Sequence, residues 1–203
     1  MRIIQSLGLS ALLMWLALGT SQAAQSPTDL VRTTAETMLS TLETRQAEIE
    51  RRPQLIYDLV GRIVAPHFDF ELITQSAVGR DWRQATPAQR QALIDAFREV
   101  LVSTYATALL KYSGEDILYQ AARPGTRSDT VIVPTQVRAP GASAIPVDYR
   151  LHNQDGDWKV YDVVIENVSL ISNYRGQFRA ILGRSGIDGL IEELRAKSRG
   201  PGA

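Results

Sequence analysis

The segment from Trp158 to Phe178 constrains the fold more than any other, because its hydrophobic pattern changes from that of a strand to that of a helix. β-Branched residues concentrate at positions 160–165 and suit a pleated surface. From Val168 onward the apolar positions recur at helical spacing. Asp155-Gly156, just before the segment, predicts a two-residue hairpin turn, since both residues tolerate a positive φ. We therefore expect the last strand of a sheet to lead directly into a helix that folds back on that sheet.

The N-terminus has the three parts of a secretory signal peptide. Arg2 is the basic start, Leu7 to Leu18 is an uncharged apolar run, and Ser21-Gln22-Ala23 supplies small residues for cleavage. The run is shorter than the roughly 20 residues that a membrane-spanning helix requires. We expect residues 1–23 to be removed and residues 24–203 to form one domain.

Composition excludes several classes of function. The chain has 22 basic and 22 acidic residues, and removal of Arg2 with the signal peptide leaves a net charge of about −1. A nearly neutral domain is unsuited to nucleic acid or to a polybasic grip on anionic membranes. With no cysteine, the fold has no disulfide and no thiolate chemistry, so its core must supply the stability.

The first half of the sequence predicts helices. Ser26-Pro27 and the capping box at Thr86 each open a helix, and the second is the longest, reaching about Tyr112. No charge occurs between Val100 and Leu110, so we expect this half of the helix to be buried on most faces as a core helix. The alternative is that it forms one wall of an apolar cavity.

Alternating apolar residues then predict strands near 117–121, 131–137 and 145–151, before the strand that begins at Trp158. Four strands with short links make an antiparallel sheet. The helix after the last strand is expected to end at Gly183, and a short helix follows from Ser185 to about Ala196. The fold class is therefore α+β, with the four-stranded antiparallel sheet packed against several helices.

Motifs for catalysis or metal binding are absent from the sequence. There is no nucleophile elbow, P-loop or dinucleotide-binding glycine pattern. His67, Asp69 and Glu71 alternate, but Asp69 is better explained as a helix cap than as a metal ligand. His152 is expected on the solvent face of its strand. We therefore predict no metal site and no cofactor.

Asp162 is the one polar residue with a possible catalytic role. It lies within the strongest predicted strand, and a buried carboxylate there must be hydrogen-bonded or have a raised pKa. In a cone-shaped α+β fold such a side chain is able to act as a general base in an apolar pocket. We favour a structural acid that pairs with an arginine or with backbone donors of the following helix, because no second positioned polar group is evident.

Three sequence blocks together resemble the MlaC-like periplasmic phospholipid-binding proteins, also called toluene-tolerance auxiliary proteins. The blocks are Trp158 to Phe178, Ala85 to Leu101, and Gly186 to Leu190, and the likeness extends from about Pro27 to Ser198. One departure is Asn167, where the family often has glycine. Asparagine is the next best residue for a positive φ, so we expect the turn to be kept.

The resemblance implies a cone-shaped fold related to nuclear-transport-factor-like proteins, with an apolar cavity between sheet and helices. It implies a periplasmic carrier, not an enzyme, that binds the acyl tails of phospholipid as cargo and helps maintain outer-membrane lipid asymmetry. The implied partners are an outer-membrane lipoprotein–porin complex and an inner-membrane ABC transporter with an MCE-domain protein. We expect a monomer. The alternatives are a small-molecule enzyme with Asp162 as base, and an adaptor that only docks proteins.

An acyl chain requires a long apolar cavity, and the uncharged segment from Val100 to Leu110, opposite the strand alternation, is suited to line one. An error of one residue in strand parity would invert a whole strand. The predicted lipid-binding residues are Leu101, Tyr105, Leu109, Ile117, Tyr119, Val131, Val133, Val147, Tyr149, Leu151, Val160, Leu170, Tyr174 and Phe178.

Overall fold

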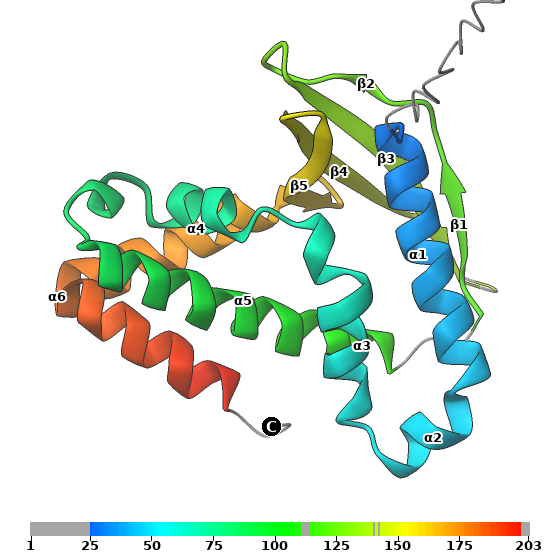
Figure 1. Cartoon of the computed structure of the whole chain (residues 1–203), viewed down its shortest axis with the longest axis horizontal. Helices are drawn as coiled ribbons and strands as arrows, with labels where there is room; N and C mark the ends of the chain where they lie inside the picture. Colours follow the sequence, from blue (N-terminus) through cyan, green and yellow to red (C-terminus); the bar gives the residue numbers. More distant parts are fainter. Residues whose placement is uncertain (1–24, 111–113, 140, 142, 200–203) are drawn as a thin grey trace, which may run out of the picture.

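The computed structural model describes residues 25–110, 114–139, 141 and 143–199. The predicted signal peptide, residues 1–23, lies outside this range. In the described part of the chain, the helical segments before the sheet are α1 (Pro27–Thr44), α2 (Gln46–Arg51), α3 (Leu55–Ile63), the 3-10 turn η1 (Ala65–His67), α4 (Phe70–Val78), the 3-10 turn η2 (Gly79–Arg83) and α5 (Pro87–Leu109). The strands are β1 (Asp116–Tyr119), β2 (Arg123–Pro124), β3 (Thr130–Arg138), β4 (Ile145–Gln154), β5 (Asp157–Ile165) and β6 (Val168–Ser169), and α6 (Leu170–Ser198) follows them. The α+β class is confirmed (Figure 1).

The two predicted helix starts are confirmed by their caps. The Ser26 hydroxyl accepts a hydrogen bond from the backbone N–H of Asp29 at 3.1 Å. At α5 the Thr86 hydroxyl accepts from the backbone of Gln89 at 3.2 Å, and the Gln89 side chain accepts from the backbone of Thr86 at 3.0 Å. This reciprocal pair satisfies two N–H groups that the first turn leaves unpaired.

The four predicted strands are β1, β3, β4 and β5, and they pair antiparallel in the order β1-β3-β4-β5, with β6 next to β5. The short β2 extends the β1 edge along β3. Asp155 (φ 53°) and Gly156 (φ 100°) form the predicted hairpin turn between β4 and β5. Asn167 has a φ of 67°, which confirms that asparagine supports the turn where the family often has glycine.

The strand-to-helix segment is present as β5, β6 and the start of α6. A positive φ of 66° at Gly186 divides α6 into two helical parts. The predicted break at Gly183 is therefore three residues too early. Gly183 keeps helical geometry, whereas Gly186 takes a backbone conformation that glycine tolerates far better than other residues.

Helices α4, α5 and α6 pack together away from the sheet (Figure 1), and one cluster of buried side chains lies between them. The ring of Phe97 on α5 lies 4.8 Å from the ring of Tyr174 and 4.9 Å from the ring of Phe178, both in edge-to-face contact. Such pairs add to the free energy gained from burial. Three buried rings therefore fix α6 against the first half of α5.

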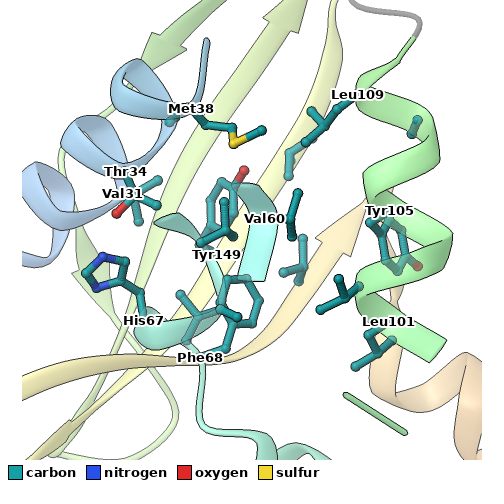
Figure 2. A pocket seen from close by; sticks show the side chains of 18 of the residues that line it. Val31, Thr34, Met38, Val60, His67, Phe68, Leu101, Tyr105, Leu109 and Tyr149 are labelled. Carbon is teal, nitrogen blue, oxygen red and sulfur yellow. The ribbon is translucent and has the colours of Figure 1, made fainter. Parts of the chain in front are cut away.

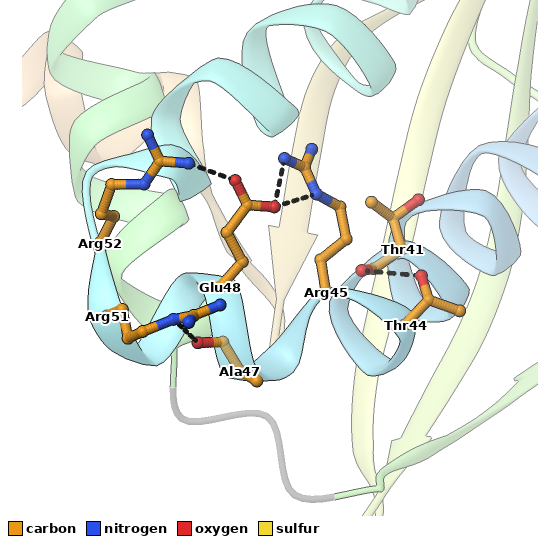
Figure 3. A network of polar contacts seen from close by, with 7 residues as sticks. All are labelled: Thr41, Thr44, Arg45, Ala47, Glu48, Arg51 and Arg52. Atoms are coloured by element: carbon orange, nitrogen blue, oxygen red, sulfur yellow. Dashed lines mark hydrogen bonds and ion pairs between the residues drawn. The ribbon is translucent and has the colours of Figure 1, made fainter.

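A polar network holds the corner between α1 and α2 (Figure 3). The Glu48 carboxylate accepts hydrogen bonds from Arg45 Nε at 2.8 Å and Nη2 at 2.6 Å, and a further one from Arg52. The two guanidinium groups, Arg45 first, lower the pKa of Glu48. At this corner the chain reverses, so that α1 runs along the sheet and α3 returns beside α5 (Figure 1).

Asp162 is a structural acid. Its side chain is 3% exposed, and its carboxylate accepts hydrogen bonds from Arg150 Nη1 at 3.0 Å, Ser169 Oγ at 2.7 Å and the backbone N–H of Ile171 at 3.2 Å. The general-base hypothesis for Asp162 is therefore wrong, because the carboxylate is engaged by donors on β4 and at the start of α6.

The predicted solvent exposure of His152 is also wrong. Its side chain is buried, and its Nε2 atom lies 2.9 Å from the Asp69 carboxylate. Asp69 caps α4, as expected, by accepting from the backbone N–H of Leu72 at 2.8 Å. The sequence pattern placed His152 on the outer sheet face but did not show that the segment around Asp69 covers that point of β4.

We predict that Asp162→Ala lowers the free energy of unfolding by about 3 kcal/mol, because it leaves the buried N–H of Ile171 and two partly buried donors without their acceptor. The matched control is Asp148→Ala on the same sheet. Asp148 pairs with Arg123 at 2.9 Å, but both side chains are more exposed, so the loss should be about 1 kcal/mol or less. Urea denaturation measures both. Equal losses for the two variants would contradict the structural role of Asp162.

Candidate functional site

An apolar pocket of about 440 Å³ lies between one face of the sheet and helices α1, α3 and α5 (Figure 2). The helical side is lined by Leu30, Val31, Thr34, Ala35, Met38, Leu39, Val60, Val64, Ala65, His67, Phe68, Phe70, Leu101, Val102, Tyr105, Ala108, Leu109 and Leu170. The sheet side is lined by Ile117, Val137, Val147, Tyr149, Val160, Val163 and Ile165.

The second half of α5 forms one wall of this pocket. Leu101, Tyr105 and Leu109 recur every four residues and line it, whereas Thr104 and Thr107 lie on another face of the helix and are exposed. The expectation that this half is buried on most faces is wrong, and the cavity-wall alternative is correct. The absence of charge on the second half of α5 allows it to border an apolar space without leaving a charge unpaired.

Side chains alternate between the two faces of the sheet, and the apolar face predicted to be the inner one lies toward the pocket. Tyr149 on β4 pairs directly with Val133 on β3 and with Val163 on β5. A bulge at Arg150/Leu151 shifts the register, so that Leu151 pairs with Val160. The extra residue keeps the apolar side chains of β5 on the inner face at both ends of the strand.

Eight of the fourteen residues predicted to bind lipid line the pocket, and the structure brings them together from α5, the sheet and the start of α6. Their contact with lipid stays a prediction. They are Leu101, Tyr105, Leu109, Ile117, Val147, Tyr149, Val160 and Leu170.

The other six do not line the pocket. Val131, Val133 and Leu151 share the inner sheet face, but the first turn of α1 packs on that end through Leu30 and Val31. Tyr119 lies under the guanidinium of Arg32, 4.5 Å from the ring centre, and burial raises its pKa to about 12. Tyr174 and Phe178 face Phe97 in the core between α5 and α6.

Sequence reasoning missed the walls made by α1 and α3, which include Met38 and Val60. The signal was present, since both helices carry apolar stripes at helical spacing. A stripe identifies the face that is buried, but it does not identify the surface on which that face packs.

The pocket's polar side chains are neutral. Thr34, His67, Tyr105 and Tyr149 are the polar ones, and no Asp, Glu, Lys or Arg is among the described lining residues. Burial raises the pKa of Tyr105 to about 12 and also raises that of Tyr149. Burial, and next the nearby Lys159 ammonium, lower the pKa of His67, so its imidazole is uncharged at pH 7. The pocket is therefore suited to an apolar ligand rather than to acid–base chemistry on a charged one.

Within the described part of the chain, no three His, Cys, Asp or Glu side chains are grouped to hold a metal ion. None of the helices described is long and apolar enough to cross a membrane.

The comparisons with known proteins all indicate the same family. The sequence model of the MlaC protein family matches residues 32–196. The toluene tolerance protein Ttg2D of Pseudomonas putida is 32% identical over 169 residues, which cover 82% of this chain and 77% of that protein. The intermembrane phospholipid transport system binding protein MlaC of Haemophilus influenzae is 26% identical over 185 residues, covering 90% and 86%.

A solved structure is also similar. The phospholipid-binding protein of Ralstonia solanacearum, determined in complex with a phospholipid, superposes with a TM-score of 0.78 at 31% identity. The match covers 86% of this chain and 97% of that one. Sequence and structure agree, and the chain belongs to the MlaC protein family.

Proposed function

We propose that this protein is a phospholipid carrier that binds the acyl chains of its cargo in the pocket between sheet and helices. It is a binding protein rather than an enzyme. The observation that carries the proposal is that the described lining of the pocket carries no charge and consists almost entirely of aliphatic and aromatic side chains. Its volume of about 440 Å³ lies within the roughly 300–1,000 Å³ that is usual for sites of small ligands.

The energetics favour this use of the pocket. Each methylene group removed from water contributes about 0.8 kcal/mol, so exposing a long acyl chain costs on the order of 10 kcal/mol. A protein that moves lipid through water must hide the chains, whereas a charged headgroup is best left in water. A pocket whose described lining holds no charged side chain meets both requirements.

The relatives support the same ligand. The similar protein of Ralstonia solanacearum was determined with a bound phospholipid. The relative from Haemophilus influenzae is named as the binding protein of an intermembrane phospholipid transport system. The same ligand class in this chain would use the pocket walls described above.

The cellular setting follows as part of the proposal. Residues 1–23 direct the chain to the periplasm and are removed, and residues 24–203 act there as a monomeric lipid-binding domain. The carrier exchanges phospholipid with an outer-membrane lipoprotein–porin complex and with an inner-membrane ABC transporter that has an MCE-domain protein. This exchange maintains outer-membrane lipid asymmetry.

We predict that the protein purified from cells carries phospholipid in a defined ratio. Native mass spectrometry should show a mass increment that an organic extract identifies as phospholipid. A protein that is lipid-free and also takes up no lipid from vesicles would refute the carrier and favour a protein-docking adaptor.

We also predict that Ala35→Trp strongly reduces lipid uptake without unfolding the protein. Ala35 lines the pocket from α1, and an indole there would occupy the space of the acyl chain. Uptake from fluorescent phospholipid vesicles should fall at least about tenfold, as expected for several methylene groups left in water.

The matched control for that variant is Ala180→Trp, at an exposed position of α6 outside the pocket. It adds the same side chain and should leave uptake and the thermal midpoint close to those of the wild type. Normal uptake by a folded Ala35→Trp variant would show that the lipid lies elsewhere.

A further inference from the structure

The Tyr149 hydroxyl is a hydrogen-bond donor that the described part of the chain does not satisfy. Tyr149 stands in the middle of the pocket-facing sheet, between Val133 and Val163 on the neighbouring strands. Figure 2 shows its hydroxyl oxygen pointing into the pocket, toward the side where Met38 and Leu109 lie. No other described residue is hydrogen-bonded to this oxygen, and the lining around it is apolar.

Tyr149 remains a donor under all physiological conditions. Burial raises the pKa of its phenol, so the proton stays on the oxygen. A phenylalanine would pack against the same strands without a polar atom. Tyr149 is half-buried and its hydroxyl borders the open space of the apolar pocket, so a ligand that brings an acceptor into this space would satisfy the donor.

We propose that the Tyr149 hydroxyl donates a hydrogen bond to the ester carbonyl oxygen of a bound acyl chain. This inference rests on the proposed function and adds to it a selectivity for acyl esters over alkyl ethers. It also fixes how deep the ligand enters, since the carbonyl carbon is the first atom of the chain.

An ester carbonyl fits this point better than a phosphate does. The carbonyl is neutral, only accepts hydrogen bonds and is bonded directly to the apolar chain that the pocket encloses. A phosphate is charged, and the described pocket lining offers no cation to pair with it. The phosphate is therefore expected outside the apolar part of the pocket.

The other polar lining groups are less suited to this role. Tyr105 is 38% exposed, so water competes for its hydroxyl. The Thr34 hydroxyl lies on α1, where Thr33 and Thr37 donate to the backbone carbonyls four residues earlier, and Thr34 has the same alternative available. The His67 imidazole is partly exposed beside Lys159.

The test is competition between two lipids that differ only in the carbonyl. Vesicles contain equal amounts of a diester phosphatidylethanolamine and a diether analogue with the same chain length and headgroup. The lipids taken up are counted by mass spectrometry. The wild type should prefer the diester by about three- to tenfold, as expected for one hydrogen bond, and Tyr149→Phe should bring the ratio close to one.

The matched control is Tyr161→Phe, which removes the same oxygen from a tyrosine of β5 outside the pocket. It should keep the wild-type ratio. Infrared spectra of the wild type with ¹³C-carbonyl lipid provide a second measurement that needs no variant, because a hydrogen-bonded ester absorbs at lower frequency than a free one.

Three results would overturn the inference alone: equal uptake of both lipids by the wild type, an unchanged preference in Tyr149→Phe, or a free-ester absorption in the wild type. A preference that disappears in Thr34→Val instead would assign the anchor to that hydroxyl and overturn it too. Uptake of neither lipid by the wild type would overturn the proposed function together with this inference.

Discussion

The buried carboxylate of Asp162 connects the sheet to the start of helix α6. It accepts from Arg150 on β4, from the capping hydroxyl Ser169 and from the first turn of α6 at Ile171. Through these contacts the sheet determines where α6 begins. The rings of Tyr174 and Phe178 then determine where α5 lies. The position of α5 opposite the sheet, and hence the width of the pocket, depends on this sequence of contacts.

The pocket remains open because the surrounding helices are held at their ends. The first turn of α1 packs on one end of the sheet through Leu30 and Val31. The first half of α5 is held in the core with α4 and α6, whereas its second half extends past that core along the pocket. A helix held in this way cannot collapse onto the sheet without losing contacts at its other end. Close packing elsewhere in the molecule thus stabilises a space that is not close-packed itself.

Much of this arrangement could be predicted from the sequence, because it depends on local rules. The turn preferences of Asp155-Gly156 and Asn167 predicted the two turns, and the capping box at Thr86 predicted the start of α5. The alternation of apolar residues predicted the inner face of the sheet, which carries Val147 and Tyr149. The residues whose surroundings were predicted wrongly are placed by contacts between segments that are distant in the sequence. Nothing local to Leu151 shows that α1 covers that end of the sheet, and nothing local to His152 shows the approach of Asp69. For the same reason the walls from α1 and α3 were missed, although their apolar stripes were evident.

The neutrality of the pocket limits what it can recognise. His67 is uncharged at pH 7 because burial opposes its protonation, and the phenols of Tyr105 and Tyr149 keep their protons for the same reason. A charged headgroup would therefore find no opposite charge on the described pocket walls and would lose its hydration there. In the proposed complex the affinity comes from the chains and selectivity from neutral hydrogen bonds, while the headgroup stays in water. Discrimination between headgroups then has to arise outside the apolar part of the pocket.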